Sequence, residues 1–111
     1  VVLLHDVPSV SVDGGVVSGH ARYVDHFGNV LTDIPEEVIR RVLGDPARVS
    51  VRVAGRDIGP LRRTYADGAP GQVIALLNSW GLVEAAVNGG RAADHLNAEP
   101  PVPRFELRAG G

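Results

Sequence analysis

Short apolar segments of strand length, most of them bounded by glycine, proline or asparagine, recur along almost the whole of this chain. The clearest lies at residues 48–53, where valine alternates with arginine and serine, as in a half-buried strand. Residues 73–77 are continuously apolar, and residues 82–87 return after a turn at 78–81, which predicts a hairpin. Many short strands with turns about every eight to twelve residues are typical of a small barrel or sandwich.

The rest of the pattern completes a mainly β chain with one or two short helices. We expect further strands at residues 16–24, 29–32, 58–65 and 104–107. A helix is expected to open at Pro35 and to end at Gly44, because proline suits the first helical turn and glycine suits the residue after the last. A second, at residues 91–96, would have Asn88 as its N-cap.

Two segments divide the chain. Residues 1–14 begin apolar and then become rich in proline, serine and glycine, so we read them as a lead-in or former linker with room for one strand. Residues 15–111 are expected to form one domain, a small β-barrel. The chain contains no methionine, even at position 1, so we expect a processed product or a fragment of a longer protein.

Composition excludes several classes of function. With no cysteine, the chain has no disulfide, thiolate nucleophile or cysteine metal site, and a cytoplasmic location is compatible and expected. A net charge of -2 argues against nucleic acid as the main partner. No apolar run approaches the length that spans a membrane, and no signal peptide is visible, so no membrane partner is expected.

The chain also lacks the residue sets that most hydrolytic and metal sites need. None of its four histidines lies four residues from another ligand on an expected helix, so we expect no metal. There is no Walker-type phosphate loop and no G-x-S-x-G elbow. We therefore assign no catalytic residue and no resident cofactor.

Polar residues beside glycines mark two candidate binding segments. Asp25 and Asn29 flank Phe27-Gly28, where a carboxylate could take an ammonium group and a carboxamide offers both a donor and an acceptor. Gly28 would allow close approach of backbone to a ligand or a positive φ. The alternative is a local turn in which both polar side chains bond their own backbone.

The second candidate segment is Asn88-Gly89-Gly90, where free N–H groups before a short helix could hold an acceptor, or Asn88 could be a plain N-cap. Ser79 and Trp80 lie in the expected hairpin turn, and the only tryptophan is either a barrel plug or an exposed stacking surface, of which the turn placement favours partial exposure. Tyr65 ends an expected strand and would either stack on a planar ligand or fill the core.

Three segments together resemble the C-terminal domain of the S-adenosyl-L-methionine (SAM) hydroxide adenosyltransferases, the family that includes the SAM-dependent fluorinase and chlorinase. The first is residues 23–34, YVDHFGNVLTDI. The second is TYAD at 64–67 followed by PG at 70–71, and the third is LNSWGLVEAAVNGGRAA at 77–93. Order and spacing match over roughly residues 15–107.

The resemblance implies a small β-barrel that follows a larger N-terminal domain, in a homotrimer whose SAM lies between the C-terminal domain of one subunit and the N-terminal domain of its neighbour. Asp25 would bind the methionine ammonium, and Ser79 would help to hold the carboxylate. Asn29, with the backbone around Asn88 and Gly89, would read the adenine edge. The ring would be lined or stacked by the aromatic residues Phe27 and Tyr65.

Two departures from the halogenating members bear on the reaction. Those members carry arginine where Trp80 stands, and they have one more residue between the aspartate and the Phe-Gly-Asn, where this chain has only His26. The second departure favours the branch that uses water. The N-terminal domain, which carries the family's water-activating residues, has no counterpart here.

We therefore expect the SAM-binding C-terminal domain of an enzyme that converts SAM and water into adenosine and L-methionine, inactive by itself. The alternative is a non-enzymatic barrel that binds an adenosyl ligand or trimerises. A small nucleic-acid-binding barrel is disfavoured, because it would need a basic face with exposed aromatic residues.

Overall fold

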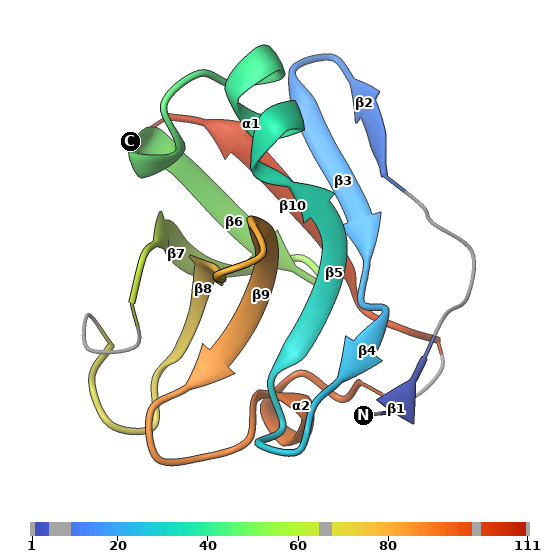
Figure 1. Ribbon diagram of the computed structural model, residues 1–111, viewed down its shortest axis with the longest axis vertical. Coiled ribbons are helices and arrows are strands. Elements are labelled where there is room, and N and C mark those ends of the chain that lie inside the picture. Colours follow the sequence, from blue (N-terminus) through green and yellow to red (C-terminus); the bar gives the residue numbers. More distant parts are fainter. Residues whose placement is uncertain (1, 5–9, 65–67, 99–100, 111) are drawn as a thin grey trace.

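The computed structural model describes residues 2–4, 10–64, 68–98 and 101–110. In this part of the chain the strands form one sheet that curls around a main core (Figure 1). The strands are β1 (Val2–Leu3), β2 (Ser11–Asp13), β3 (Val16–His20), β4 (Tyr23–Val24), β5 (Val30–Pro35), β6 (Val49–Val53), β7 (Arg56–Arg62), β8 (Val73–Leu77), β9 (Leu82–Val87) and β10 (Arg104–Ala109). The helices are α1 (Glu36–Val42), the 3-10 turn η1 (Pro46–Arg48) and α2 (Ala92–His95). The mainly β prediction is confirmed.

The strand order across the sheet is β1-β4-β5-β9-β8-β7-β6-β10-β3-β2. Neighbouring strands are antiparallel except β7 and β8, which are parallel. β1 and β2 belong to the expected lead-in, where they pair with β4 and β3 at the two ends of this order. The site described below depends on one detail of the order, the antiparallel pairing of β5 with β9.

The sheet curls because β3 and β4, which are consecutive in the chain, lie near opposite ends of the strand order. β3 pairs with β10, whereas β4 pairs with β5 on the other side of the sheet. At the break, Ala21 N donates to Pro103 O at 2.9 Å and Arg22 N donates to Leu31 O at 2.7 Å. The expectation of one strand over residues 16–24 is wrong for this reason, since a single stretch of chain serves two neighbours in succession.

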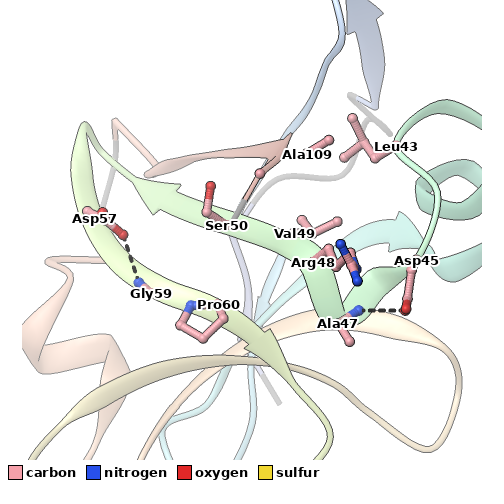
Figure 2. Close-up of a pocket in the computed structure, with 11 residues that line it drawn as sticks. Leu43, Asp45, Ala47, Arg48, Val49, Ser50, Asp57, Gly59, Pro60 and Ala109 are labelled. Carbon is pink, nitrogen blue, oxygen red and sulfur yellow. Dashed lines mark hydrogen bonds between the residues drawn. The ribbon is translucent and has the colours of Figure 1, made fainter.

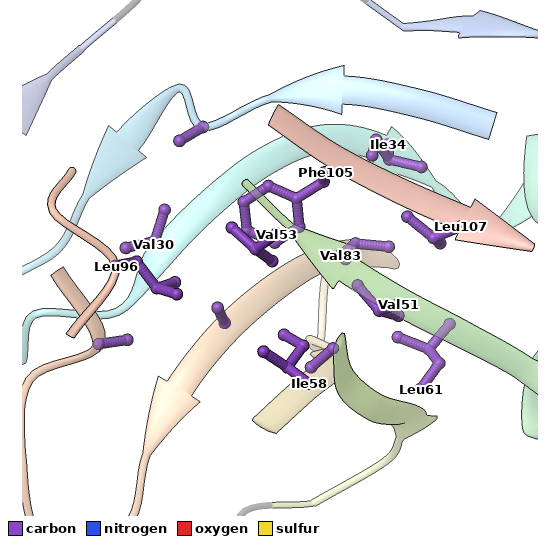
Figure 3. Close-up of a cluster of buried hydrophobic side chains, with 14 of the residues drawn as sticks. Val30, Ile34, Val51, Val53, Ile58, Leu61, Val83, Leu96, Phe105 and Leu107 are labelled. Carbon is purple, nitrogen blue, oxygen red and sulfur yellow. The ribbon is translucent and has the colours of Figure 1, made fainter. Parts of the chain in front are cut away.

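The interior is filled by alternate residues of the strands. Val51 and Val53 of β6, Phe105 and Leu107 of β10 and Ile34 of β5 are all completely buried and point into one cluster (Figure 3). Fully burying a side chain of this kind stabilises a fold by about 1.5–3 kcal/mol. β8 and β9 are buried on both faces, and Ile74, Leu76 and Ala86 form a second small cluster on the outer one.

The helices are shorter than the expected ones. α1 begins at Glu36, after Pro35 at the N-cap, and its last turn closes with Leu43 N and Gly44 N both donating to Ile39 O. α2 covers only Ala92–His95, with Arg91 at its N-cap position. Asn88 as an N-cap is therefore wrong, because a turn at residues 87–90 separates it from the helix. No helix in the described ranges is long and apolar enough to cross a membrane.

Candidate functional site

Two of the predicted segments meet at one end of the barrel. Val30, the first residue of β5, lies opposite Ala85, near the last residue of β9, so the loop before β5 and the turn after β9 are neighbours. Between them lies a cavity of about 550 Å³, lined by Phe27, Asn29, Val87, Asn88, Gly89 and Gly90. The structure thus brings together four of the residues singled out in the sequence, Phe27, Asn29, Asn88 and Gly89.

The loop at residues 25–29 is held by the Asp25 carboxylate. Oδ1 accepts from Phe27 N and Asn29 N, both at 2.9 Å, and Oδ2 accepts from Asn29 Nδ2 at 3.0 Å. These hydrogen bonds are those of a local turn, which the sequence analysis gave as the alternative to a ligand contact. Because Asn29 is 6% exposed and its amide nitrogen faces Asp25, the orientation of the Asn29 amide is set inside the loop.

The turn at residues 87–90 forms the other wall. Asn88 is tied to the segment before β8, since its Nδ2 donates to Gly68 O at 3.2 Å and its carbonyl accepts from Gly71 N at 2.9 Å. In the described part of the chain neither Asn88 Oδ1 nor Gly89 N has a hydrogen-bond partner. Two consecutive residues therefore offer an acceptor and a donor beside the cavity.

Phe27 supplies an apolar surface at the rim. Its side chain is 78% exposed, although its backbone N–H is fixed by Asp25. An aromatic ring held on an ordered loop and left in solvent is suited to stacking on a planar ligand or a second surface.

Ser79 and Trp80 lie at the other end of β9. They occupy the β8–β9 turn, where Asn78 Oδ1 accepts from Trp80 N at 3.0 Å and Leu82 N at 3.1 Å. This turn lies beside α1, because Glu36 N donates to Gly81 O at 2.8 Å (Figure 1). The six residues of β9 span about 20 Å, so neither residue lines the cavity, although Trp80 is 77% exposed. Tyr65 lies outside the described residues.

The sequence interpretation missed Arg91, and of the two uses it named for Gly28 the structure has the positive φ. Gly28 has a φ of 80°, and a Cβ placed there would lie 2.6 Å from Arg91 Cβ, so the close approach is to the chain itself rather than to a ligand. Ala93 N donates to Gly28 O at 2.9 Å, and Arg91 Nη1 donates to His26 O at 3.3 Å. The glycine was a usable signal, but its partner, 63 positions away, was not visible in the sequence.

A larger cavity, of about 700 Å³, lies where β6, β7 and the end of β10 meet η1 (Figure 2). Its two carboxylates serve the local backbone, because Asp45 accepts from Ala47 N at 3.0 Å and Asp57 accepts from Gly59 N at 2.8 Å. None of the residues predicted from the sequence lines it.

Charge and metal chemistry are not concentrated at either cavity. Among the described residues, no group of three or more histidine, aspartate or glutamate side chains could hold a metal ion. A hydrogen bond from Arg40 holds the pKa of Glu36 below its ordinary value, and the positive charges of Arg40 and Arg63 add to that effect. Glu36 belongs to α1, near the β8–β9 turn.

Comparisons with known proteins agree with the motifs. A family model described as the SAM hydroxide adenosyltransferase C-terminal domain matches residues 19–103. A protein named (R)-S-adenosyl-L-methionine hydrolase from Salinispora tropica is 36% identical over 104 residues, which are 94% of this chain and 37% of that protein. One of the same name from Thermus thermophilus is 35% identical over 85 residues, 77% of this chain and 30% of the relative.

Solved structures have the same fold. An uncharacterized conserved protein from Thermotoga maritima matches with a TM-score of 0.73 and 27% identity, over 94% of this chain and 40% of its own. A conserved hypothetical protein from Thermus thermophilus matches with a TM-score of 0.63 and 32% identity, over 96% and 39%. This chain thus spans about a third of the length of the curated relatives and about two fifths of the solved chains.

Proposed function

The chain belongs to the SAM hydroxide adenosyltransferase family, and from this premise we propose that it is the SAM-binding part of a cytoplasmic enzyme that converts SAM and water into adenosine and L-methionine. In this reaction water displaces methionine from the ribose C5′ carbon, and the positive charge of the sulfonium is lost. The chain's part is to bind and orient SAM, which lowers the barrier by fixing the reacting geometry.

The observation that carries the proposal is the meeting of Phe27 and Asn29 with Asn88 and Gly89 around one cavity. These residues come from segments about 60 positions apart in a chain whose family acts on SAM. We assign Phe27 to stack on the adenine ring, and Asn29 to its edge. Asn88 Oδ1 and Gly89 N–H would accept from the exocyclic amine and donate to the neighbouring ring nitrogen.

The polarity of this pair supplies a test of substrate class. With N1 as that ring nitrogen, a 6-oxo purine presents an acceptor at O6 and a donor at N1, the reverse of adenine, so both hydrogen bonds would be lost and the polar groups left facing each other. We expect adenosine to bind at least tenfold more tightly than inosine, measured by NMR titration of the 111-residue chain. Equal affinity for the two nucleosides would remove the adenine assignment.

The methionine end has two candidate positions. The ammonium and carboxylate groups of methionine are bonded to one carbon, whereas the loop that carries Asp25 lies beside the end of β9 and Ser79 lies in the turn before its start, and β9 itself spans about 20 Å. One ligand on one chain therefore uses one of the two. Loss of SAM affinity in Asp25→Asn but not in Ser79→Ala would place the methionine at the 25–29 loop, and the reverse would place it at the turn that also carries Trp80.

We further propose that the site is shared with the N-terminal domain of a neighbouring subunit in a homotrimer. The exposure of Phe27 supports this, because a ligand stacked on the ring would still have its other face in solvent. We expect no turnover of SAM by the 111-residue chain alone and turnover after the rest of the protein is added. Micromolar SAM binding by the lone chain, without activity in either mixture, would instead favour a non-enzymatic adenosyl-binding barrel.

A further inference from the structure

The outer side of the 25–29 loop is packed against the segment that begins α2. Arg91 Nη1 donates to His26 O at 3.3 Å, and Ala93 N donates to Gly28 O at 2.9 Å. At Gly28 the two backbones are so close that a Cβ would lie 2.6 Å from Arg91 Cβ and 3.0 Å from Arg91 Cα. None of these contacts is made by a side chain that lines the cavity.

The guanidinium of Arg91 makes one other contact within the described part of the chain. Its second contact is with Asp94, at 3.8 Å between Nε and Oδ2, and the Asp94 side chain is 73% exposed. An exposed ion pair of this length contributes little to stability, since solvent screens it. The carbonyl of His26, one residue before Phe27, is therefore the directed contact of this side chain.

We propose that Arg91 is a positioning residue for the cavity, which holds the 25–29 loop from outside while Asp25 holds it from inside. Phe27 is 78% exposed, so core packing does not fix its ring, and the place of the ring depends on the backbone of residues 26–28. The fixed loop would spare a ligand the entropy cost of ordering it. The identity of the ligand, adenosine, rests on the function proposed above.

The test replaces Arg91 by methionine, which keeps an unbranched apolar stem over Gly28 but removes the donor. The matched control is Arg41→Met, because Arg41 is exposed on α1 and its side chain makes no hydrogen bond or ion pair within the described part of the chain. We expect the adenosine affinity of Arg91→Met to fall about three- to tenfold, with a melting temperature no lower than that of the control. Arg91→Lys, which keeps a charged donor, should recover part of the affinity, and Asp94→Ala should change nothing.

Adenosine affinity equal to that of the control, or an equal loss in Asp94→Ala, would overturn the proposal. A readout without ligand separates this outcome from failure of the proposed function. Hydrogen exchange at the amides of Phe27 and Asn29, which both donate to Asp25, should be faster in Arg91→Met than in Arg41→Met. If the wild-type chain does not bind adenosine but the exchange difference is present, the positioning role stands and the ligand assignment fails; equal exchange rates overturn the positioning role itself. Should Arg91→Met not fold, the same comparisons apply to Arg91→Ala, which also removes the donor.

Discussion

At the scale of single residues, Asp25 illustrates how one side chain shapes a loop. Its carboxylate accepts three hydrogen bonds within five residues, two from backbone and one from the Asn29 amide. The sequence allowed either a local turn or a ligand contact, and the hydrogen bonds are those of the local turn. A carboxylate oxygen can accept more than one hydrogen bond, so this role is compatible with the ligand contact that we propose.

Removing the Asp25 carboxylate should destabilise the chain. Asp25→Ala leaves the partly buried Asn29 N–H and the Asn29 amide without their acceptor, which should cost about 1–3 kcal/mol in the free energy of unfolding. Urea unfolding measures this cost, with Asp94→Ala as the exposed control. Equal stability of Asp25→Ala and Asp94→Ala would mean that the loop does not depend on the carboxylate.

Two glycines, one in the 25–29 loop and one that lines the cavity, provide a matched pair of substitutions. Gly28 and Gly89 have nearly the same φ, 80° and 78°, but a Cβ at Gly28 would collide with Arg91, whereas a Cβ at Gly89 would meet nothing within 4 Å. Both changes to alanine should cost about 1–3 kcal/mol for the strained backbone, and Gly28→Ala should cost more because of the collision. The same unfolding experiment compares them, and a larger loss in Gly89→Ala would contradict the packing described.

At the scale of elements, the β8–β9 hairpin could be predicted from sequence to its last residue, because an apolar run, a turn rich in asparagine and glycine and a second apolar run all specify the same structure. Residues 16–24 could not. Their sequence is that of a strand throughout, and the break at Ala21 and Arg22 depends on where β10 and β5 end in space. The short α2 likewise reflects the turn after β9.

The first turn of α1 should make stability depend on pH. Arg40 lowers the pKa of Glu36 in the folded chain, so the unfolded chain binds more protons in the acidic range. The contribution of Glu36 is therefore present above its ordinary value of 4.5 and is lost as the pH falls through the lowered value. Melting temperatures of wild type and Glu36→Gln should differ at pH 7 and converge in acid; a gap that widens in acid would be inconsistent with the Arg40 contact.

At the scale of the whole molecule, the curled sheet creates the candidate site by placing the start of β5 beside the end of β9. The motifs around Asn29 and Asn88 could be found in the sequence, and the family resemblance implied that both contact the adenine edge of one ligand. The sequence already placed Ser79 and Trp80 before the strand at residues 82–87 and Asn88 after it, but it did not indicate which of these two ends lies beside the 25–29 loop, because motif spacing along the chain does not specify which strands pair.

The core that holds these ends apart should be sensitive to truncation. Phe105 is completely buried between the strands, so Phe105→Ala should cost about 3–5 kcal/mol by loss of burial and creation of a cavity. Val12, which is 48% exposed on β2, is the control for a truncation at the surface. A loss at Phe105 as small as that at Val12 would show that the interior is not packed as described.

The central claim is that the cavity between the 25–29 loop and the 87–90 turn binds the adenosine part of the ligand. It is tested most directly by intermolecular NOEs in a mixture of the 111-residue chain and excess adenosine. We expect NOEs from the base protons of adenosine to the ring of Phe27 and to the side-chain amides of Asn29 and Asn88. NOEs to Leu43 and Pro60, which line the larger cavity, in place of those to Phe27 would contradict the claim.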